Sequence, residues 1–413
     1  MNAARALERP RRRWTLAVPA AVAFVAVTAC KSGTSTSTST SAPHPLNPRE
    51  SLGHDIFFDT SLSTPPGTSC ASCHDPRRAF AGNNGSTVGV AAGSRAGHFA
   101  RRNTPSVLYM RQVPELHFAL EDDDDVNPSP FGGLTWSGRA DSVAEFVRLP
   151  LLDADEMNNS GEGEIAAKLR AAPYAAALAG EFPHALDTPP AAVRALGDAL
   201  QAFLTSDAMT PFSSRYDAFL HGETKLTELE MRGLAAFKSP EKGACSGCHH
   251  LYDKSTRSDR SMFTDYGYDA VAVPRNHDIP ANADPARFDL GLCERHQRKV
   301  PSSDPRWCAS FRTPSLRNVA VRERFMHNGA FRTLREVVAF YANRATRPGA
   351  VYPPGAKYDD VPPRYRDNVN VTSLPYNRRE GDRPPLDDAD VDAIVAFLGT
   401  LTDAQFTGAV AAN

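Results

Sequence analysis

Two short stretches of the chain place paired cysteines directly before a histidine. They read Cys70-Ala71-Ser72-Cys73-His74 and Cys245-Ser246-Gly247-Cys248-His249. The C-x-x-C-H spacing is the attachment signature of a c-type haem, in which both thiols bond to the haem and the histidine ligates the iron. A four-cysteine zinc site is the alternative, but zinc would not require a histidine after each pair. The sequence therefore predicts two covalently bound haem c groups, with His74 and His249 as axial ligands of the iron.

The first residues of the chain predict export. Five arginines between positions 5 and 13 precede a mostly apolar run from Trp14 to Ala29, which has the length of a signal peptide and is short for a membrane span. The run ends in Val27-Thr28-Ala29-Cys30, which resembles a bacterial lipobox; an ordinary secretory signal with a chance cysteine is the alternative. We predict a lipoprotein signal peptide over residues 1–29. The mature protein would face the periplasm, held to the membrane by lipid on Cys30, at the outer membrane in a Gram-negative cell.

The rest of the chain divides at changes in composition. Residues 30–45 contain a Ser/Thr tract with no apolar face and predict a flexible tether. The remaining length suits two domains, and the separation of the haem motifs suggests one haem in each. We predict an N-terminal haem domain over 46–205 and a C-terminal haem domain over 206–413. The net charge of −2 and a charged fraction of 23% give no sign of a nucleic-acid partner.

Two of the seven cysteines are left once the haem motifs and Cys30 are assigned. In an oxidising compartment Cys293 and Cys308 are expected to form a disulfide. The chain-entropy model gives such a loop roughly 3 kcal/mol of stabilisation. This disulfide would staple a Pro- and Arg-rich insert between Leu251 and Ser310, which has little periodicity of its own.

Helical signals dominate the elements that must position these residues. Thr-x-x-Glu capping boxes at Thr227 and Thr333 open two predicted helices. The second helix would place Val337, Val338 and Tyr341 on one face. Further helices are predicted over 165–179, over 191–204, and along the apolar stripe 391–401 after Asp387 and Asp388. Strand signals are few, so the predicted fold class is mainly α.

Four more motifs occur in a fixed order along the chain. They are L-G-x-x-I-F-F-D-x-x-L-S at 52–63, W-S-G-R-A at 136–140, F-R-T-P-S-L-R-N-V at 311–319 and M-H-N-G at 326–329. Together with the haem motifs they resemble the bacterial di-haem cytochrome c peroxidase family, which includes the MauG-like enzymes. The resemblance covers essentially the whole mature chain. It implies two cytochrome c-like haem domains, a first haem that is the site of peroxide chemistry and a second haem that relays electrons.

The resemblance also implies roles for residues around the first haem. Glu156, about twenty positions after Trp136, corresponds to the distal acid/base that moves the peroxide proton; an exposed loop acid is the alternative. Trp136 corresponds to the tryptophan between the haems, where an indole can mediate electron transfer, and this role is compatible with a buried core tryptophan. Many relatives have a glutamine about ten residues after this tryptophan, where this chain has Phe146.

Two residues upstream correspond to further ligands in the family. His98 lies near the position of a histidine that binds the first haem iron on its distal side at rest and is released on reduction. A solvated loop histidine is the alternative, and it would leave the first haem open, as in the MauG-like branch. Asn103 corresponds to a ligand of a calcium ion between the haems. This chain has Arg322-Glu323-Arg324 where relatives have Thr-x-Pro, so two cations lie near the calcium position.

The second haem has His249 on one side and needs a distal ligand on the other. In the family this ligand falls about fourteen residues after the histidine of the H-x-G motif, and it is methionine in some peroxidases and tyrosine in MauG. Counting from His327 gives Tyr341. Met326 is the competing ligand.

The predicted function follows from these assignments. We expect an enzyme that reduces hydrogen peroxide, with electrons relayed through the second haem from a small redox protein such as a cytochrome c or a cupredoxin. The alternative within enzymes is a MauG-like oxidase that uses peroxide to oxidise a protein or organic substrate. A non-enzymatic electron-transfer cytochrome is a third class, but a pure electron carrier needs no distal acid such as Glu156.

Overall fold

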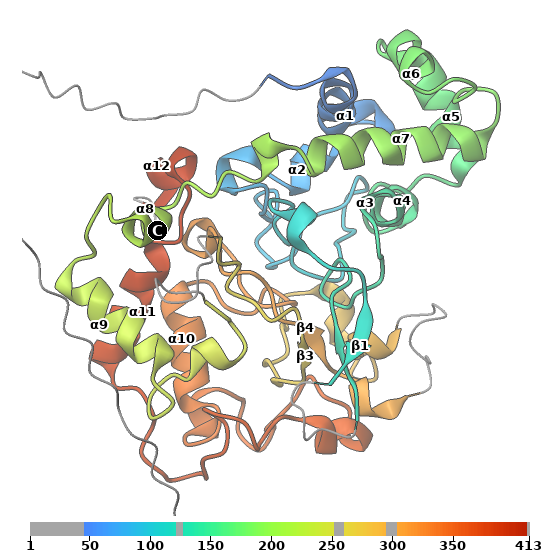
Figure 1. Cartoon of the computed structure of the whole chain (residues 1–413). Coiled ribbons are helices and arrows are strands. Elements are labelled where there is room, and N and C mark those ends of the chain that lie inside the picture. The colour runs from blue at the N-terminus through green and yellow to red at the C-terminus, as the bar shows by residue number, and fades with distance from the viewer. Residues whose placement is uncertain (1–44, 121–126, 252–259, 295–303, 411–413) are drawn as a thin grey trace, which may run out of the picture. The chain divides into compact units, whose positions relative to one another are not determined.

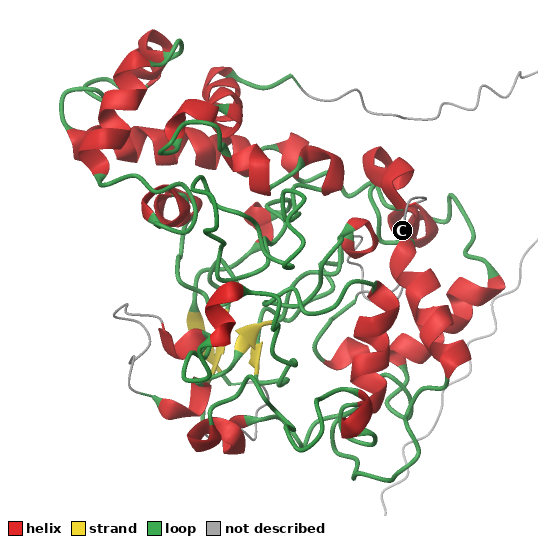
Figure 2. Cartoon of the chain, turned by 180° about the vertical axis from the view of Figure 1, so that it is seen from behind, coloured by secondary structure: helices red, strands yellow, loops and turns green. Residues whose placement is uncertain are grey.

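The computed structural model describes residues 45–120, 127–251, 260–294 and 304–410, and is mainly helical with long loops (Figures 1 and 2). The helices are α1 Pro48–Phe58, α2 Cys70–Cys73, α3 Val143–Phe146, α4 Arg148–Leu152, α5 Glu162–Ala171, α6 Ala175–Glu181, α7 Pro189–Leu204, α8 Arg215–His221, α9 Glu228–Lys238, α10 Leu334–Asn343, α11 Asp388–Gly399 and α12 Thr407–Val410. The strands are β1 His117–Ala119, β2 Ser129–Phe131, β3 Tyr268–Asp269 and β4 Phe311–Arg312. The prediction of a mainly α chain is confirmed.

The predicted signal peptide, most of the predicted tether and Cys30 lie outside the described residues. Within the described ranges, no helix is both long enough and apolar enough to cross a membrane.

The helices begin where the capping residues predict. The Thr227 and Thr333 side chains accept from the backbone N–H of Glu230 and Glu336, and so open α9 and α10. Asp387 caps α11, which ends at Gly399, so Leu401 of the predicted stripe lies just beyond the helix. The alanine-rich segment 165–179 is divided between α5 and α6, because Pro173 lacks an N–H and cannot continue a helix.

Two helix pairs cross in the same way. In α1 against α7, Gly53 lies against the carbonyl of Ala199 and the Cβ of Phe203. In α9 against α11, Gly233 lies in the same way against Ala393 and Phe397. A Cβ at either glycine would overlap the facing carbonyl oxygen, so glycine sets the close approach of both pairs. The chain therefore builds the same helix crossing twice, once beside each haem motif.

This crossing predicts a stability effect. Gly233→Ala is expected to lower the free energy of unfolding by about 1–3 kcal/mol, because the added methyl group must push the two helices apart. Gly180→Ala in α6 is the matched control, because a Cβ there would meet open space and should not destabilise the helix. Denaturant unfolding of the haem-loaded protein measures both. Equal stability of Gly233→Ala and the parent would contradict the packing argument.

The buried apolar side chains form two main clusters. One contains side chains of α1, α5 and α7, together with Val321 and Phe406 from later in the chain. The other contains side chains of α9, α10 and α11. Along the chain, the first cluster ends at Met209 and the second begins at Tyr216, close to the predicted domain boundary at residue 205. Val321 and Phe406 are exceptions, because they follow this boundary in the sequence but belong to the first cluster. The boundary itself stays a prediction.

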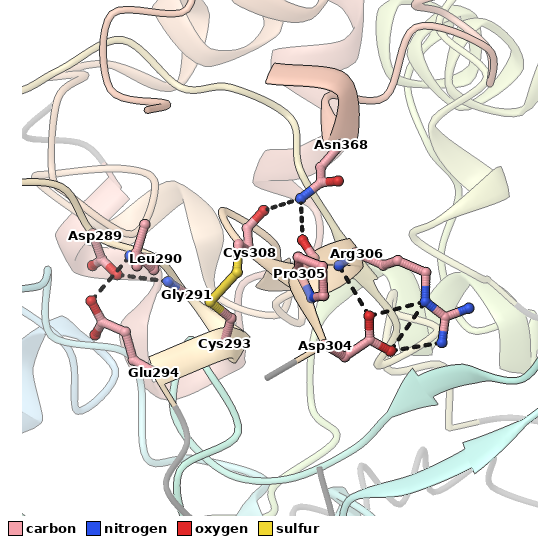
Figure 3. Close-up of a disulfide and its surroundings, with 10 residues drawn as sticks. All are labelled: Asp289, Leu290, Gly291, Cys293, Glu294, Asp304, Pro305, Arg306, Cys308 and Asn368. Atoms are coloured by element: carbon pink, nitrogen blue, oxygen red, sulfur yellow. Dashed lines mark hydrogen bonds and ion pairs between the residues drawn. A yellow bond between two sulfur atoms is a disulfide. The ribbon is translucent and has the colours of Figure 1, made fainter. Parts of the chain in front are cut away.

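Two pairs of short strands and a disulfide organise the long loops between the helices. Strands β1 and β2 pair antiparallel, with His117 opposite Phe131, and β3 and β4 pair antiparallel, with Tyr268 opposite Arg312. The predicted disulfide between Cys293 and Cys308 is present (Figure 3). Asn368 donates from Nδ2 to the carbonyl oxygens of Pro305 and Cys308, which fastens the disulfide to the C-terminal part of the chain. Parts of the insert between Leu251 and Ser310, residues 252–259 and 295–303, lie outside the described residues.

Candidate functional site

The first haem motif lies in the wall of a cavity. Cys70 to Cys73 form α2, and His74 follows at its end. The cavity is lined by both motif cysteines and His74 and by residues from several later segments, among them Trp136, Arg139, Phe146, Glu156 and Met157. The His74 Nδ1 lies 3.2 Å from the carbonyl oxygen of Phe80.

The second motif repeats this arrangement in another cavity. Cys245 to Gly247 form a 3-10 turn, and the Nδ1 of His249 lies 2.9 Å from the carbonyl oxygen of Phe263. In both motifs a carbonyl accepts from Nδ1, which leaves Nε2 as the nitrogen that can bind a metal. Burial lowers the pKa of both histidines, that of His74 to about 4, so both rings are neutral. A neutral imidazole is the form that ligates iron.

The thiols do not form a zinc site. The pair Cys70 and Cys73 and the pair Cys245 and Cys248 line different cavities, so four sulfurs cannot share one ion. Burial raises the pKa of Cys70, Cys73 and Cys245 to about 12, which favours thiols over the thiolates that zinc requires. Across the described part of the chain, no three His, Cys, Asp or Glu side chains converge to hold a metal ion.

The residues present do fit a haem in each cavity. Each cavity wall offers two unbridged thiols and the histidine that directly follows them. Each also holds a buried nitrogen with no partner among the described residues, Arg139 Nε in the first cavity and His327 Nε2 in the second. Haem carries two carboxylates, which such donors can bind. The donor sets therefore match two covalently attached haems.

Glu156 faces the first cavity. It follows α4 in a turn closed by the bond from Glu156 N to the carbonyl of Asp153, 3.1 Å long. Burial and then the neighbouring Asp153 carboxylate raise the pKa of Glu156 to about 7, against the opposing effect of the Arg139 guanidinium. A carboxyl group that titrates near neutral pH can both accept and return a proton. The prediction that Glu156 lies near the first haem motif agrees with this geometry.

Arg139 is a residue of this cavity that sequence reasoning did not single out. It belongs to the W-S-G-R-A motif, and this membership is the sequence feature that could have identified it as a site residue. Burial lowers its pKa, and its positive charge acts on Glu156 across the cavity. It can therefore stabilise negative charge that develops near Glu156 or bind a haem carboxylate.

Trp136 lies in the wall that the two cavities share. It lines both of them, as does Phe146. Its Nε1 donates to the carbonyl oxygen of Asn103 over 2.7 Å, and its own carbonyl accepts from the N–H of Arg312 over 2.8 Å. The side-chain bond therefore connects Trp136 to a loop that lines the first cavity, and the backbone bond connects it to β4, which lines the second cavity. An indole held in this position can couple the two sites.

A buried ion-pair network holds the residues next to Trp136. Arg102 donates to Asp289 through two bonds of 2.6 Å and to Ser137 Oγ at 2.6 Å. Arg102 also donates to the carboxylate of Glu294, which lies next to Cys293 of the disulfide. The same carboxylate accepts from the N–H of Leu290 (Figure 3). Arg102 precedes Asn103 and Ser137 follows Trp136, so the stapled insert fixes the segment between the cavities.

His98 does not line the first cavity. Its Nδ1 lies 2.8 Å from Asp155 Oδ1 and 3.1 Å from a terminal nitrogen of Arg95. Its side chain is 37% exposed. In this structure His98 is therefore held at the protein surface beside the Glu156 loop, which matches the alternative of a loop histidine.

Asn103 is buried where the resemblance implies a calcium ion. Its Nδ2 donates to the carbonyl oxygens of Arg324 and Met326, each over 3.0 Å. The Arg322 guanidinium also donates to the carbonyl oxygens of Arg324 and Thr104. N–H donors thus occupy oxygens that calcium would need, and a cation lies beside them. The calcium ion stays a prediction.

Tyr341 and Met326 both line the second cavity. Val337 and Val338 line it too, as the predicted face of α10 requires. Burial, and then the proximity of Cys248 and Cys245, raise the pKa of the Tyr341 hydroxyl, so this hydroxyl lies near the motif thiols. Sequence reasoning missed Tyr376, which stacks on Tyr341 with ring centroids 6.0 Å apart and hydrogen-bonds to it. Arg344 covers the Tyr376 ring at 3.8 Å.

Two cavities that each carry a C-x-x-C-H motif, joined by a tryptophan and with an acid over one of them, define a di-haem c-type oxidoreductase. The family described as di-haem cytochrome c peroxidase matches residues 47–225. The methylamine utilization protein MauG of Paracoccus denitrificans is 34% identical over 365 residues, covering 86% of this chain and 88% of that protein. The chain belongs to the di-haem cytochrome c peroxidase and MauG family.

Two further similarities support this assignment. The crystal structure of the diheme peroxidase BthA from Burkholderia thailandensis is 52% identical in sequence, with a TM-score of 0.83 over 88% of each chain. The cytochrome-c peroxidase IdrP2 of Denitromonas iodatirespirans is 27% identical over 311 residues, 70% of this chain and 72% of that protein. The chain is thus an oxidoreductase of the peroxidase type, and its family implies two c-type haems, a peroxide substrate and a redox partner.

Haem loading can be tested directly. Protein made with the haem-maturation machinery is expected to show a mass increment of two haems. Cys245→Ala combined with Cys248→Ala should remove one of them, because both thioether bonds of the second haem are lost. Intact mass spectrometry measures both, and a single haem in the parent protein would contradict the assignment.

Proposed function

We propose that this chain reduces hydrogen peroxide in the first cavity, with Glu156 as the acid/base catalyst. The observation that carries the proposal is the position of Glu156 in the cavity of the first haem motif, with a pKa of about 7. The haem held by Cys70, Cys73 and His74 supplies the oxidation–reduction chemistry when bound. The overall reaction takes two electrons and two protons per peroxide and releases two water molecules.

The residues of the cavity then have separate tasks. The Glu156 carboxylate accepts the proton of one peroxide oxygen and returns it to the other, so that the second oxygen leaves as water. Arg139 stabilises the negative charge that builds up during this transfer. Phe146 stands where many relatives have glutamine, so this chain relies on Glu156 and Arg139 for polar contacts with peroxide.

Electrons would reach the first cavity from the second. Trp136 lies in the shared wall and is the proposed route between them. Tyr341 is the proposed distal ligand of the second haem, supported by its hydroxyl near Cys245 and Cys248. The proposed donor is a small redox protein, a cytochrome c or a cupredoxin.

A MauG-like oxidase of a protein or organic substrate is the second candidate. Two observations favour it: a tyrosine in the wall of the second cavity, and His98 bound to Asp155, away from the first cavity. An enzyme of this kind needs no reduction before it reacts with peroxide. A non-enzymatic electron carrier is disfavoured, because it would not need an acid in the first cavity such as Glu156.

The location proposed for the mature protein is the periplasm, with lipid on Cys30 as the anchor. This proposal rests on the sequence of residues 1–30 alone.

One experiment separates the candidate functions. Steady-state peroxide turnover with a reduced small cytochrome is measured before and after one-electron reduction of the enzyme. A peroxidase activated by reduction gains activity from the pretreatment. An enzyme with an open first cavity shows full activity without it, and a pure electron carrier shows no turnover in either state.

A further inference from the structure

The loop that carries Glu156 is hydrogen-bonded to a second loop, residues 93–98. The N–H of Ser94 donates to the carbonyl oxygen of Glu156 over 2.7 Å. Arg95 donates to the carbonyl oxygen of Ala154 over 2.9 Å, and His98 Nδ1 lies 2.8 Å from Asp155 Oδ1. Three consecutive residues, Ala154 to Glu156, are therefore each bound by this one segment.

Gly93 lets the two loops approach this closely. A Cβ on Gly93 would overlap the carbonyl oxygen of Asp155 and lie 3.0 Å from that of Glu156. No positive φ is required at this position, so glycine is needed for the contact between the loops and not for its backbone conformation.

Both loops are tied to one further point, Thr64, six residues before Cys70. Its carbonyl oxygen accepts from Ser94 Oγ over 2.8 Å and from Asn158 Nδ2 over 2.9 Å. Its N–H donates to the carbonyl oxygen of Met157 over 2.9 Å. The positions of the two loops relative to the first haem motif are thus fixed together.

The Glu156 side chain has no such support of its own. Among the described residues, no hydrogen bond reaches its carboxyl group, so the bonds of its backbone fix the point from which the side chain enters the first cavity. From these contacts we infer that residues 93–98, here called the clamp, position the Glu156 carboxyl over the first cavity. Gly93, Ser94 and His98 are then positioning residues. The inference rests on the proposed role of Glu156 and extends it.

Gly93→Ala tests the clamp. The added methyl group must displace the Asp155 carbonyl, and kcat/KM for peroxide is expected to fall by about 10²-fold, as a displacement of about 1 Å can cost. Haem content should stay unchanged. Gly163→Ala in α5 is the matched control, because a Cβ there meets open space, and it should keep parental kcat/KM.

The double variant Gly93→Ala with Glu156→Gln distinguishes an effect on the position of Glu156 from a general loss of active-site structure. If Gly93 acts through Glu156, adding Gly93→Ala to Glu156→Gln leaves the residual turnover unchanged, because coupled sites are not additive. A further loss in the double variant would overturn the inference while leaving the role of Glu156 intact. Parental activity of Glu156→Gln alone would instead overturn the proposed function.

Hydrogen exchange gives a readout that does not depend on activity. The amide of Ser94 is protected by its bond to Glu156. In Gly93→Ala, peptides covering residues 91–99 and 150–158 should exchange faster in the haem-loaded protein, and in Gly163→Ala they should not. Unchanged exchange in both variants would contradict the clamp.

His98→Ala provides a second variant, because the His98 side chain is 37% exposed and its removal should leave the packed core unchanged. The clamp predicts a several-fold fall in kcat/KM and faster exchange at 150–158, with the first haem's spectrum unchanged. If His98 instead bound the first haem iron, its removal would convert that haem from low to high spin and raise turnover. This opposite result would overturn the inference even if Gly93→Ala failed to fold.

Discussion

Replacing Glu156 with glutamine is expected to lower kcat/KM for hydrogen peroxide by about 10²–10⁴-fold, the usual contribution of a positioned acid/base group. Glutamine has nearly the same size, but it cannot accept and return a proton. Both haems should stay attached, because Glu156 makes no contact needed to hold the motif cysteines. Steady-state peroxide assays and intact mass spectrometry on the same preparations measure the two quantities.

The pH dependence of the parent enzyme follows from the same group. Burial raises the pKa of Glu156 to about 7, so the carboxyl becomes protonated as the pH falls through this value. The base form is the one that takes the peroxide proton, so kcat/KM should fall on the acid side of about pH 7. This limb should disappear in Glu156→Gln. In Asp153→Asn it should move to lower pH, because the neighbouring negative charge that raises the Glu156 pKa has been removed.

A surface carboxylate serves as the control for this prediction. Glu380 is exposed and lines neither of the two cavities, so Glu380→Gln should leave both the rate and the pH profile unchanged. Activity of Glu156→Gln within a few-fold of the parent would mean that another group, or water alone, moves the proton.

Local patterns in the sequence predicted much of this architecture. The C-x-x-C-H motifs specify their own chemistry, because the thiols and the histidine must be adjacent to bind one haem. The boxes at Thr227 and Thr333 predicted the starts of α9 and α10, because the capping bonds run only three residues. The disulfide followed from the assignment of the other cysteines.

Contacts between distant segments could not be predicted in this way. His98 lies near the expected position of an iron ligand, yet its partner is Asp155, 57 positions further along the chain. Tyr376 contacts Tyr341 from a loop without helical or strand periodicity, so no sequence pattern predicts this contact. The sequence does not distinguish Gly93 from other loop glycines, because the need for glycine comes from the carbonyl of Asp155, a residue distant in the chain.

The walls of the two cavities also differ in polarity. Glu156 is one of several polar groups in the first cavity, along with Arg139, Asp153 and Asp155. The Tyr341 region of the second cavity is mostly apolar and aromatic, with Val337, Val338 and Leu334 beside it. This difference agrees with the proposal of peroxide chemistry in the first cavity and electron transfer through the second.

The second prediction with a large effect concerns Tyr341. In Tyr341→Phe the second haem is expected to lose its low-spin, six-coordinate spectrum, because phenylalanine offers no ligand atom. In Tyr341→Met its reduction potential should rise, because a thioether favours ferrous iron whereas a phenolate oxygen favours ferric iron. Axial ligands span roughly 0.8 V in haem proteins, so the shift should be readily measured. Optical and electron paramagnetic resonance spectra, with a redox titration, report these changes.

Tyr365→Phe is the control, because Tyr365 lines neither haem cavity and packs in a separate small cluster. Its spectra and potentials should match those of the parent. If Tyr341→Phe keeps an unchanged low-spin spectrum, Tyr341 is not the ligand. Met326 then becomes the candidate, and Met326→Leu should remove the low-spin signature instead. A methionine ligand would make the second haem easier to reduce and able to hold an activating electron. The mechanism in which peroxide turnover begins only after one-electron reduction would then be favoured over the MauG-like one.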